Sequence, residues 1–80
     1  MPRYYFHIHN DQHVVDEEGQ LLPDEVAARQ CALESARDLV CMSVKEGHLN
    51  LDHYLAVADE SGLPLFNVTF REAFTIEGRD

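Results

Sequence analysis

Apolar and polar residues alternate along the first ten positions of the chain. One side of this pattern holds Tyr4, Phe6 and Ile8, and the other holds Tyr5, His7 and His9. A period of two is typical of a strand with one buried face, so residues 3–9 are predicted to form a strand with Tyr4, Phe6 and Ile8 in the core. The polar residues 10–12 then form a turn, and residues 13–15 return as the second strand of a hairpin.

The same alternation recurs after position 50. Residues 51–60 place Leu51, His53, Leu55 and Val57 on one face and Tyr54, Ala56 and Ala58 on the other. The Ser-Gly-Leu-Pro segment at 61–64 is a turn, and residues 65–70 complete a second hairpin with Phe66, Val68 and Phe70 towards the core. The tail from residue 71 is expected to add a short turn or edge segment and to fray from about residue 77.

Between the hairpins, a helix is predicted over residues 24–46. Pro23, Asp24 and Glu25 are typical of a helix start, and Lys45 and Gly47 of a helix end. At 100° per residue, one arc interrupted by Arg29 and Ser43 gathers Val26, Ala28, Ala32, Leu33, Ala36, Leu39, Val40 and Val44. Within this arc, the stripe Val26, Leu33, Ala36, Val40 and Val44 is expected to pack on the sheet.

The order strand, strand, helix, strand, strand (ββαββ) predicts an α+β two-layer sandwich: an antiparallel sheet with one long helix on one face. Eighty residues make a single small domain, 1–80. One helix can cover only one face of the sheet. We expect the other face to be a partly apolar interaction surface carrying Tyr5, His7, His9, His13, Val15, Tyr54 and Leu65.

Charge and cysteine content restrict the setting of the protein. Fifteen acidic and six basic residues give a net charge of −9, which disfavours binding to nucleic acid or to anionic membranes. No apolar run approaches the ~20 residues of a membrane span and no leader is recognisable, so a soluble, cytoplasmic protein is expected. Cys31 and Cys41 lie about 15 Å apart along the predicted helix and are expected to be free thiols, as in a reducing compartment.

Four segments resemble a known family. They are MPRYYFH at the start, the acidic DEEG, LPDEVAAR at the helix start, and VADESGLPLFNVTF. In this order they resemble a family of small uncharacterised bacterial proteins, a domain of unknown function that opens with MPRYFFH-like residues, over roughly residues 2–76. The family often has an Asp-Gly pair after the first strand, where this chain has Asn10-Asp11-Gln12-His13. The resemblance implies a stand-alone bacterial domain and no catalytic residues.

The stretch HIHNDQH holds the strongest chemical signal in the chain. Across a hairpin with a three-residue loop, His9 faces His13 with Cβ atoms about 5 Å apart. His7, His9 and His13 could then bind Zn, Ni or Cu, with Asp11 or water as the fourth ligand. The same histidines could act as a pH switch. No metal-binding motif of known spacing is present, and the acids at 16–18 lack the spacing of a calcium loop and are expected to form a solvated turn.

We therefore expect a non-enzymatic interaction module without a cofactor, which self-associates as a homo-oligomer or binds a protein partner through the uncovered sheet face or a sheet edge. The alternative is a transition-metal-binding or metal-sensing protein that uses the histidine cluster. An enzyme ranks third, because the sequence has no nucleophile elbow, phosphate-binding loop or nucleotide-binding glycine pattern.

Overall fold

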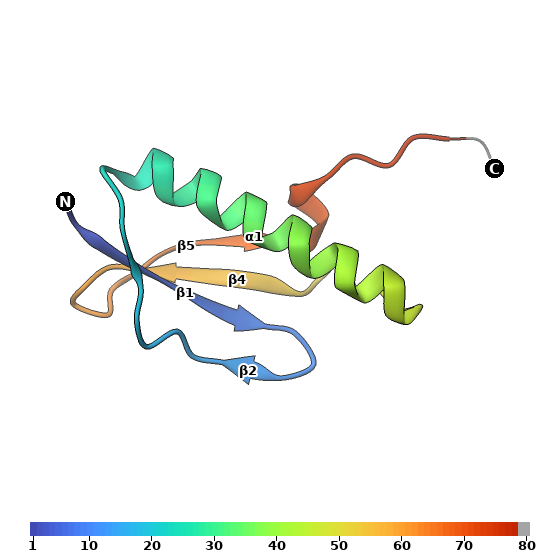
Figure 1. Ribbon diagram of the computed structural model, residues 1–80, viewed down its shortest axis with the longest axis horizontal. Coiled ribbons are helices and arrows are strands. Elements are labelled where there is room, and N and C mark those ends of the chain that lie inside the picture. The colour runs from blue at the N-terminus through green and yellow to red at the C-terminus, as the bar shows by residue number, and fades with distance from the viewer. Residues whose placement is uncertain (79–80) are drawn as a thin grey trace.

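A five-stranded antiparallel sheet with one long helix across one face forms the structure, a computed structural model that describes residues 1–78 (Figure 1). The elements, in chain order, are β1 (Arg3–His9), β2 (His13–Val14), β3 (Gln20–Leu21), α1 (Glu25–Glu46), β4 (Tyr54–Ala58), β5 (Pro64–Thr69) and the 3-10 helix η1 (Phe70–Ala73). This confirms the predicted α+β sandwich and adds the short strand β3, which the pattern did not indicate. The tail was predicted to fray from about residue 77, and residues 79–80 of that segment lie outside the described residues.

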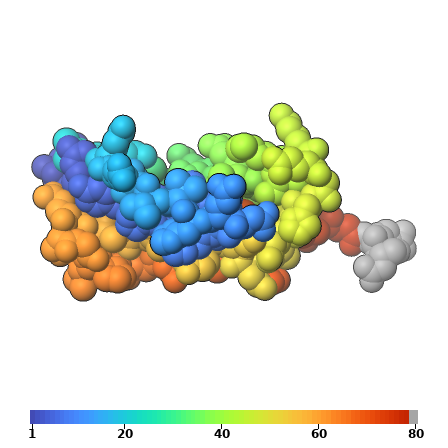
Figure 2. Space-filling model, turned by 90° about the horizontal axis from the view of Figure 1, so that it is seen from below, coloured from blue at the N-terminus to red at the C-terminus, as the bar shows by residue number. Residues whose placement is uncertain are grey.

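The sheet has the order β2-β1-β4-β5, so β1 and β4 lie at its centre although the helix separates them in sequence. Phe6 faces Val57 and Ile8 faces Leu55 across this central pair. Both β2 and β3 pair with β1, one near each of its ends. Figure 2 shows the N-terminal hairpin in blue along this edge, with α1 in green above it. No helix among residues 1–78 is long and apolar enough to cross a membrane.

The core lies between the sheet and α1. It consists of the buried residues Tyr4, Phe6, Ala28, Ala32, Ala36, Val40, Leu55, Val57, Val68, Phe70 and Ala73. The alternating strand residues predicted to face the core are therefore the ones that do. Three of the four buried helix residues are alanines, and their small side chains let the helix lie close to the sheet.

The predicted packing stripe on α1 is wrong at both ends. Val26 is 78% exposed and Val44 is 59% exposed. The buried residues of α1 recur every four positions from Ala28 to Val40, and Val26 and Val44 lie roughly 100° around the helix from the middle of that row. The alanine row, which permits the closest approach, thus faces the sheet instead of the row with the largest aliphatic side chains.

Both ends of α1 are capped as the sequence predicts. Asp24 is the N-cap, and its carboxylate accepts a hydrogen bond of 2.9 Å from the Ala27 N–H. Gly47 ends the helix with φ 84°, and its N–H donates to the carbonyl of Val44 at 3.0 Å. These local signals placed the helix within one residue of its observed start.

Asp16 organises the segment between β2 and β3, which was expected to be only a solvated turn. Its carboxylate accepts hydrogen bonds of 3.1 Å from the backbone N–H groups of Phe6, Glu18 and Gly19. Partial burial raises the pKa of Asp16, but these three donors outweigh it and hold the pKa below the ordinary value of an aspartate. On the side of β1 away from β4, β2 and β3 pair only with the ends of the strand. In the gap between them, the Asp16 carboxylate accepts the Phe6 N–H hydrogen bond that a neighbouring strand would otherwise accept.

Gly19 lies against β1 at a point where no side chain fits. Its φ is +69°, and a Cβ atom there would lie 2.8 Å from the Tyr4 carbonyl oxygen. Gly19→Ala is expected to lower the free energy of unfolding by about 2 kcal/mol, from backbone strain and this clash together. Gly62→Ala is the matched control, because Gly62 has φ +86° with nothing within 4 Å of the new Cβ, and about 1 kcal/mol is expected. Urea unfolding measures the free energy of unfolding of both variants, and an equal decrease in the two would contradict the close contact at Gly19.

Candidate functional site

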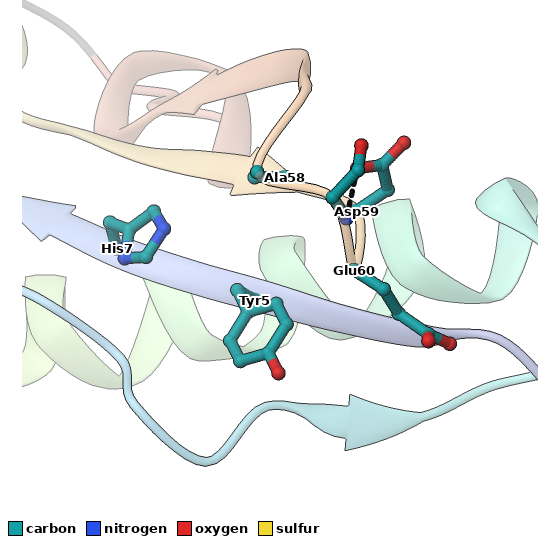
Figure 3. A pocket seen from close by; sticks show the side chains of 7 residues that line it. Tyr5, His7, Ala58, Asp59 and Glu60 are labelled. Atoms are coloured by element: carbon teal, nitrogen blue, oxygen red, sulfur yellow. Dashed lines mark hydrogen bonds between the residues drawn. The ribbon is translucent and has the colours of Figure 1, made fainter.

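The candidate site is the face of the sheet opposite α1, here called the open face. Because Phe6, Ile8, Leu55 and Val57 face the helix, their neighbours in β1 and β4 face away from it. The aromatic residues of the open face are Tyr5, His7, His9, His13 and Tyr54. In Figure 3, Tyr5 and His7 project from β1 on the side away from α1, which lies behind the sheet in this view. These five residues are placed as predicted.

Three of these rings form a continuous stack across three strands. The His9 ring lies between His13, with ring centroids 4.2 Å apart, and Tyr54, with centroids 4.6 Å apart. His9 and His13 are paired in the hairpin, and His9 and Tyr54 are paired between β1 and β4. Tyr5 and His7 lie further along β1 with nearly parallel rings and centroids 6.5 Å apart. The open face is therefore a platform of aromatic rings that partly cover one another.

The stack favours the neutral form of its central histidine. Burial among the neighbouring rings lowers the pKa of His9, and the charges that His13 and His7 acquire on protonation lower it further. A neutral His9 leaves the centre of the open face without a charge at neutral pH.

The proposed metal ligands are not gathered in one place. The Nδ1 atom of His7 accepts a hydrogen bond of 3.1 Å from the Asp16 N–H, so the lone pair of this nitrogen is not free to bind a metal ion. Asp11 lies 3.6 Å from Nε2 of His53, and both line a hollow on the helix side of the sheet together with Leu39 and Ser43 of α1. Within residues 1–78, no three His, Cys, Asp or Glu side chains are placed to hold a metal ion.

Two residues expected on the open face depart from it. Val15 follows the end of β2 and lines a hollow with Phe6, Ile8 and Val14 at the edge of β1, because Asp16 takes the chain out of the strand pairing. Leu65 is half-buried and packs against the core. The pairing of β4 with β5 shifts by one residue between Val57 and Ala58, and this bulge changes the alternation near Leu65.

The open face instead includes Asn67 and Thr69 of β5. They pair with Ala56 and Tyr54, which lie on the open face of β4. Sequence reasoning assigned Phe66, Val68 and Phe70 to the core and did not assign the residues between them to the open face. The alternation along β5 was the signal that could have identified Asn67 and Thr69.

A hollow of about 300 Å³ opens beside Tyr5 and His7, against the turn from β4 to β5 (Figure 3). Its two carboxylates are engaged with the backbone. Asp59 accepts hydrogen bonds from the N–H groups of Ser61 and Leu63 and from the Ser61 hydroxyl. The bond from this hydroxyl is the main reason that the pKa of Asp59 is below its ordinary value. Glu60 accepts a hydrogen bond of 2.8 Å from the Arg3 N–H. The hollow therefore has a rigid acidic rim next to an aromatic floor.

The helix-side hollow brings a serine near two histidines without forming a nucleophile and base pair. Ser43, His48 and His53 all line it. Among the hydrogen bonds of the described part of the chain, none joins the Ser43 hydroxyl to either histidine. The His53 ring instead packs edge-on against Phe70, with centroids 5.6 Å apart, so this ring contributes to the core.

Comparison with known proteins gives one match. The family model for a domain of unknown function, DUF6894, matches residues 3–71, which include all five strands and α1. No curated protein and no solved structure matches the chain. The match confirms the resemblance to a domain of unknown function, and we conclude that the chain belongs to the DUF6894 family.

Proposed function

We propose that this domain is a non-enzymatic interaction module that self-associates or binds a protein partner through the open face. One observation carries the proposal: the open-face positions of β1, β4 and β5 hold no acidic residue, although the chain has fifteen. Of the five rings, His13 is exposed and the other four are half-buried, and solvent-accessible aromatic side chains with few charges around them are typical of the centre of a protein interface. Arg3 at the start of β1 is the only Lys, Arg, Asp or Glu on the open-face positions of these strands, so on a protein of charge −9 a partner that binds over His9 and Tyr54 does not have to desolvate a carboxylate of the sheet.

The non-enzymatic part of the proposal is supported by what the polar groups near the open face do. Asp16 and Asp59 accept hydrogen bonds from backbone N–H groups, and Nδ1 of His7 does the same. A carboxylate held by several donors is a weak base, because the donors stabilise its charged form. These groups stabilise local structure and are poorly suited to transfer protons to a substrate.

We further propose that the protein works in a reducing compartment such as the cytoplasm. Both cysteines are free thiols on α1; Cys31 is half-buried and Cys41 is exposed. Burial raises the pKa of the Cys31 thiol, which keeps it protonated and unreactive. An exposed free cysteine is tolerated best where thiols stay reduced.

The proposal can be tested by photo-crosslinking from the open face. A photoreactive phenylalanine analogue replaces Tyr54 in one variant and Glu34, which is exposed on α1, in a control variant. After irradiation in cells that express the protein, the Tyr54 variant is expected to give a discrete adduct with one protein, either this chain or another, as identified by mass spectrometry. No adduct, or equal adducts from both positions, would contradict a binding role for the open face.

Competition makes this test specific. Excess wild-type protein should suppress the adduct, whereas Tyr5→Lys protein should need an at least about tenfold higher concentration, because a lysine at the contact must be desolvated. Metal analysis of protein purified without an affinity tag covers the alternative function. One metal ion per chain that is lost in His9→Ala would replace the interaction role of the histidine cluster with a metal site.

A further inference from the structure

Strand β5 forms one margin of the sheet, and no strand within the described residues pairs with its outer edge. It lies in residues 61–70, which is the longest stretch of the chain without a charged residue. Proteins usually protect an exposed sheet edge with charged side chains, with proline or by keeping the strand short. Pro64 and the bulge opposite Ala58 lie at the start of β5, whereas the segment from Phe66 to Thr69 has no charged residue, proline or bulge.

The backbone of β5 has outward-facing hydrogen-bonding groups. The Phe70 N–H donates to the His53 carbonyl at 2.8 Å, on the side of β4. Since alternate residues of an antiparallel strand bond to the same neighbour, Val68 and Phe66 bond to β4 while Asn67 and Thr69 point outward. The Thr69 N–H is bonded to the Glu72 carboxylate at 3.1 Å, but within residues 1–78 nothing bonds to the Asn67 N–H or carbonyl from outside the sheet.

The opposite edge of the sheet is closed to further pairing. It consists of β2 and β3, which have two residues each. Between them the Asp16 carboxylate occupies the Phe6 N–H, so no continuous row of free backbone groups remains. An added strand is therefore accommodated best at β5.

Two ion pairs lie near the C-terminal half of β5. The Arg29 guanidinium lies 2.9 Å from the Glu72 carboxylate and 5.7 Å from the centre of the Phe66 ring. Arg71 lies 3.1 Å from Asp52. A strand that approaches this half of β5 thus meets paired charges, which matters for a protein that otherwise repels its own copies with a charge of −9.

We propose that β5 pairs antiparallel with β5 of a second copy of this chain, with Asn67 opposite Asn67 of that copy. Each Asn67 N–H then donates to the Asn67 carbonyl of the other copy, and the two sheets become one. A second copy is the occupant because it brings an equally uncharged strand in a self-complementary, two-fold arrangement, the commonest symmetry of soluble oligomers. This inference rests on the proposal that the domain is an interaction module. It places self-association at the sheet edge, in addition to binding through the open face.

The decisive variants differ in one backbone group. Asn67→Pro removes the outward N–H and is compatible with an edge strand, whereas Asn67→Ala removes the same side chain and keeps the N–H. In sedimentation equilibrium, wild type and Asn67→Ala are expected to be dimers with similar dissociation constants. Asn67→Pro is expected to raise the constant at least about tenfold, because each dimer loses two hydrogen bonds. Equal constants for the two variants would overturn the proposal.

Hydrogen exchange of the wild-type protein gives a test that needs no variant. The Asn67 amide should be protected at high protein concentration and exchange faster on dilution, whereas the Val68 amide, bonded within the chain, should stay protected at both. Added salt should strengthen the dimer by screening repulsion between acidic copies. A protein that stays monomeric up to about 1 mM would overturn this pairing. So would a dimer that Tyr54→Lys dissociates and Asn67→Pro does not, and that result would support the open face instead.

Discussion

Ala32→Asp is expected to unfold the domain. Ala32 is fully buried in the middle of the alanine row of α1, against the sheet. An aspartate there has to be desolvated without a partner, at a cost of several kcal/mol. A loss of about 4 kcal/mol corresponds to a fall in Tm of roughly 15–30 °C for a domain of this size, and small domains have little stability to lose. Circular dichroism during thermal unfolding measures the change.

Val26→Asp is the matched control for this first prediction. It introduces the same charge on the same helix, but Val26 is 78% exposed. Its effect on the free energy of unfolding is expected to stay within about 0.5 kcal/mol. If Val26→Asp were as harmful as Ala32→Asp, α1 would be rotated relative to the structure and the stripe predicted from the sequence would be the buried one.

Asp16→Ala is expected to lower the free energy of unfolding by about 3 kcal/mol at neutral pH. The substitution removes the acceptor of three backbone hydrogen bonds and leaves the Phe6 N–H without a partner on a partly buried edge. Charged acceptors stabilise such donors more than neutral ones do, and an unpaired buried donor adds its own desolvation penalty. Asp16→Asn, which keeps one accepting oxygen, should lose about half as much. Urea unfolding measures both variants.

The effect of Asp16→Ala should depend on pH in a defined direction. The pKa of Asp16 in the folded protein is below its ordinary value of about 3.9, so its carboxylate stabilises the fold fully above that value. This contribution is lost as pH falls from about 4 through the lower pKa of the folded state. The difference between wild type and Asp16→Ala should therefore be largest near neutral pH and shrink below about pH 4. A difference that is constant with pH would mean that Asp16 acts through packing and not through its charge.

Signals within a few residues of each other were enough to predict the long elements. Alternation placed β1 at residues 3–9, and Asp24 and Gly47 marked the ends of α1. The pairing of His9 with His13 also followed from a three-residue loop. Each of these features depends on backbone geometry and side-chain spacing inside one element or one hairpin.

Features that join distant segments could not be predicted in this way. The His9 ring stacks on Tyr54 because β1 pairs with β4, although the whole helix lies between these two strands in the sequence. Asp16 bonds to Phe6 ten positions away, and the acidic run around it looked like a solvated turn. Asp11 lies near His53 on the helix side of the sheet, so the predicted group of metal ligands is divided between the two faces.

The sequence by itself determined the number of long elements, the strand residues that face the core and the existence of one uncovered sheet face. These follow from periods of 2 and 3.6 residues, which are local properties of strands and helices. Only the tertiary structure decided which side of the predicted apolar arc of α1 faces the sheet, that Asp16 closes one sheet edge and that β5 leaves the other edge open. Strand order and register depend on packing between segments far apart in the chain, where many arrangements satisfy the same local pattern and the close fit of side chains selects one.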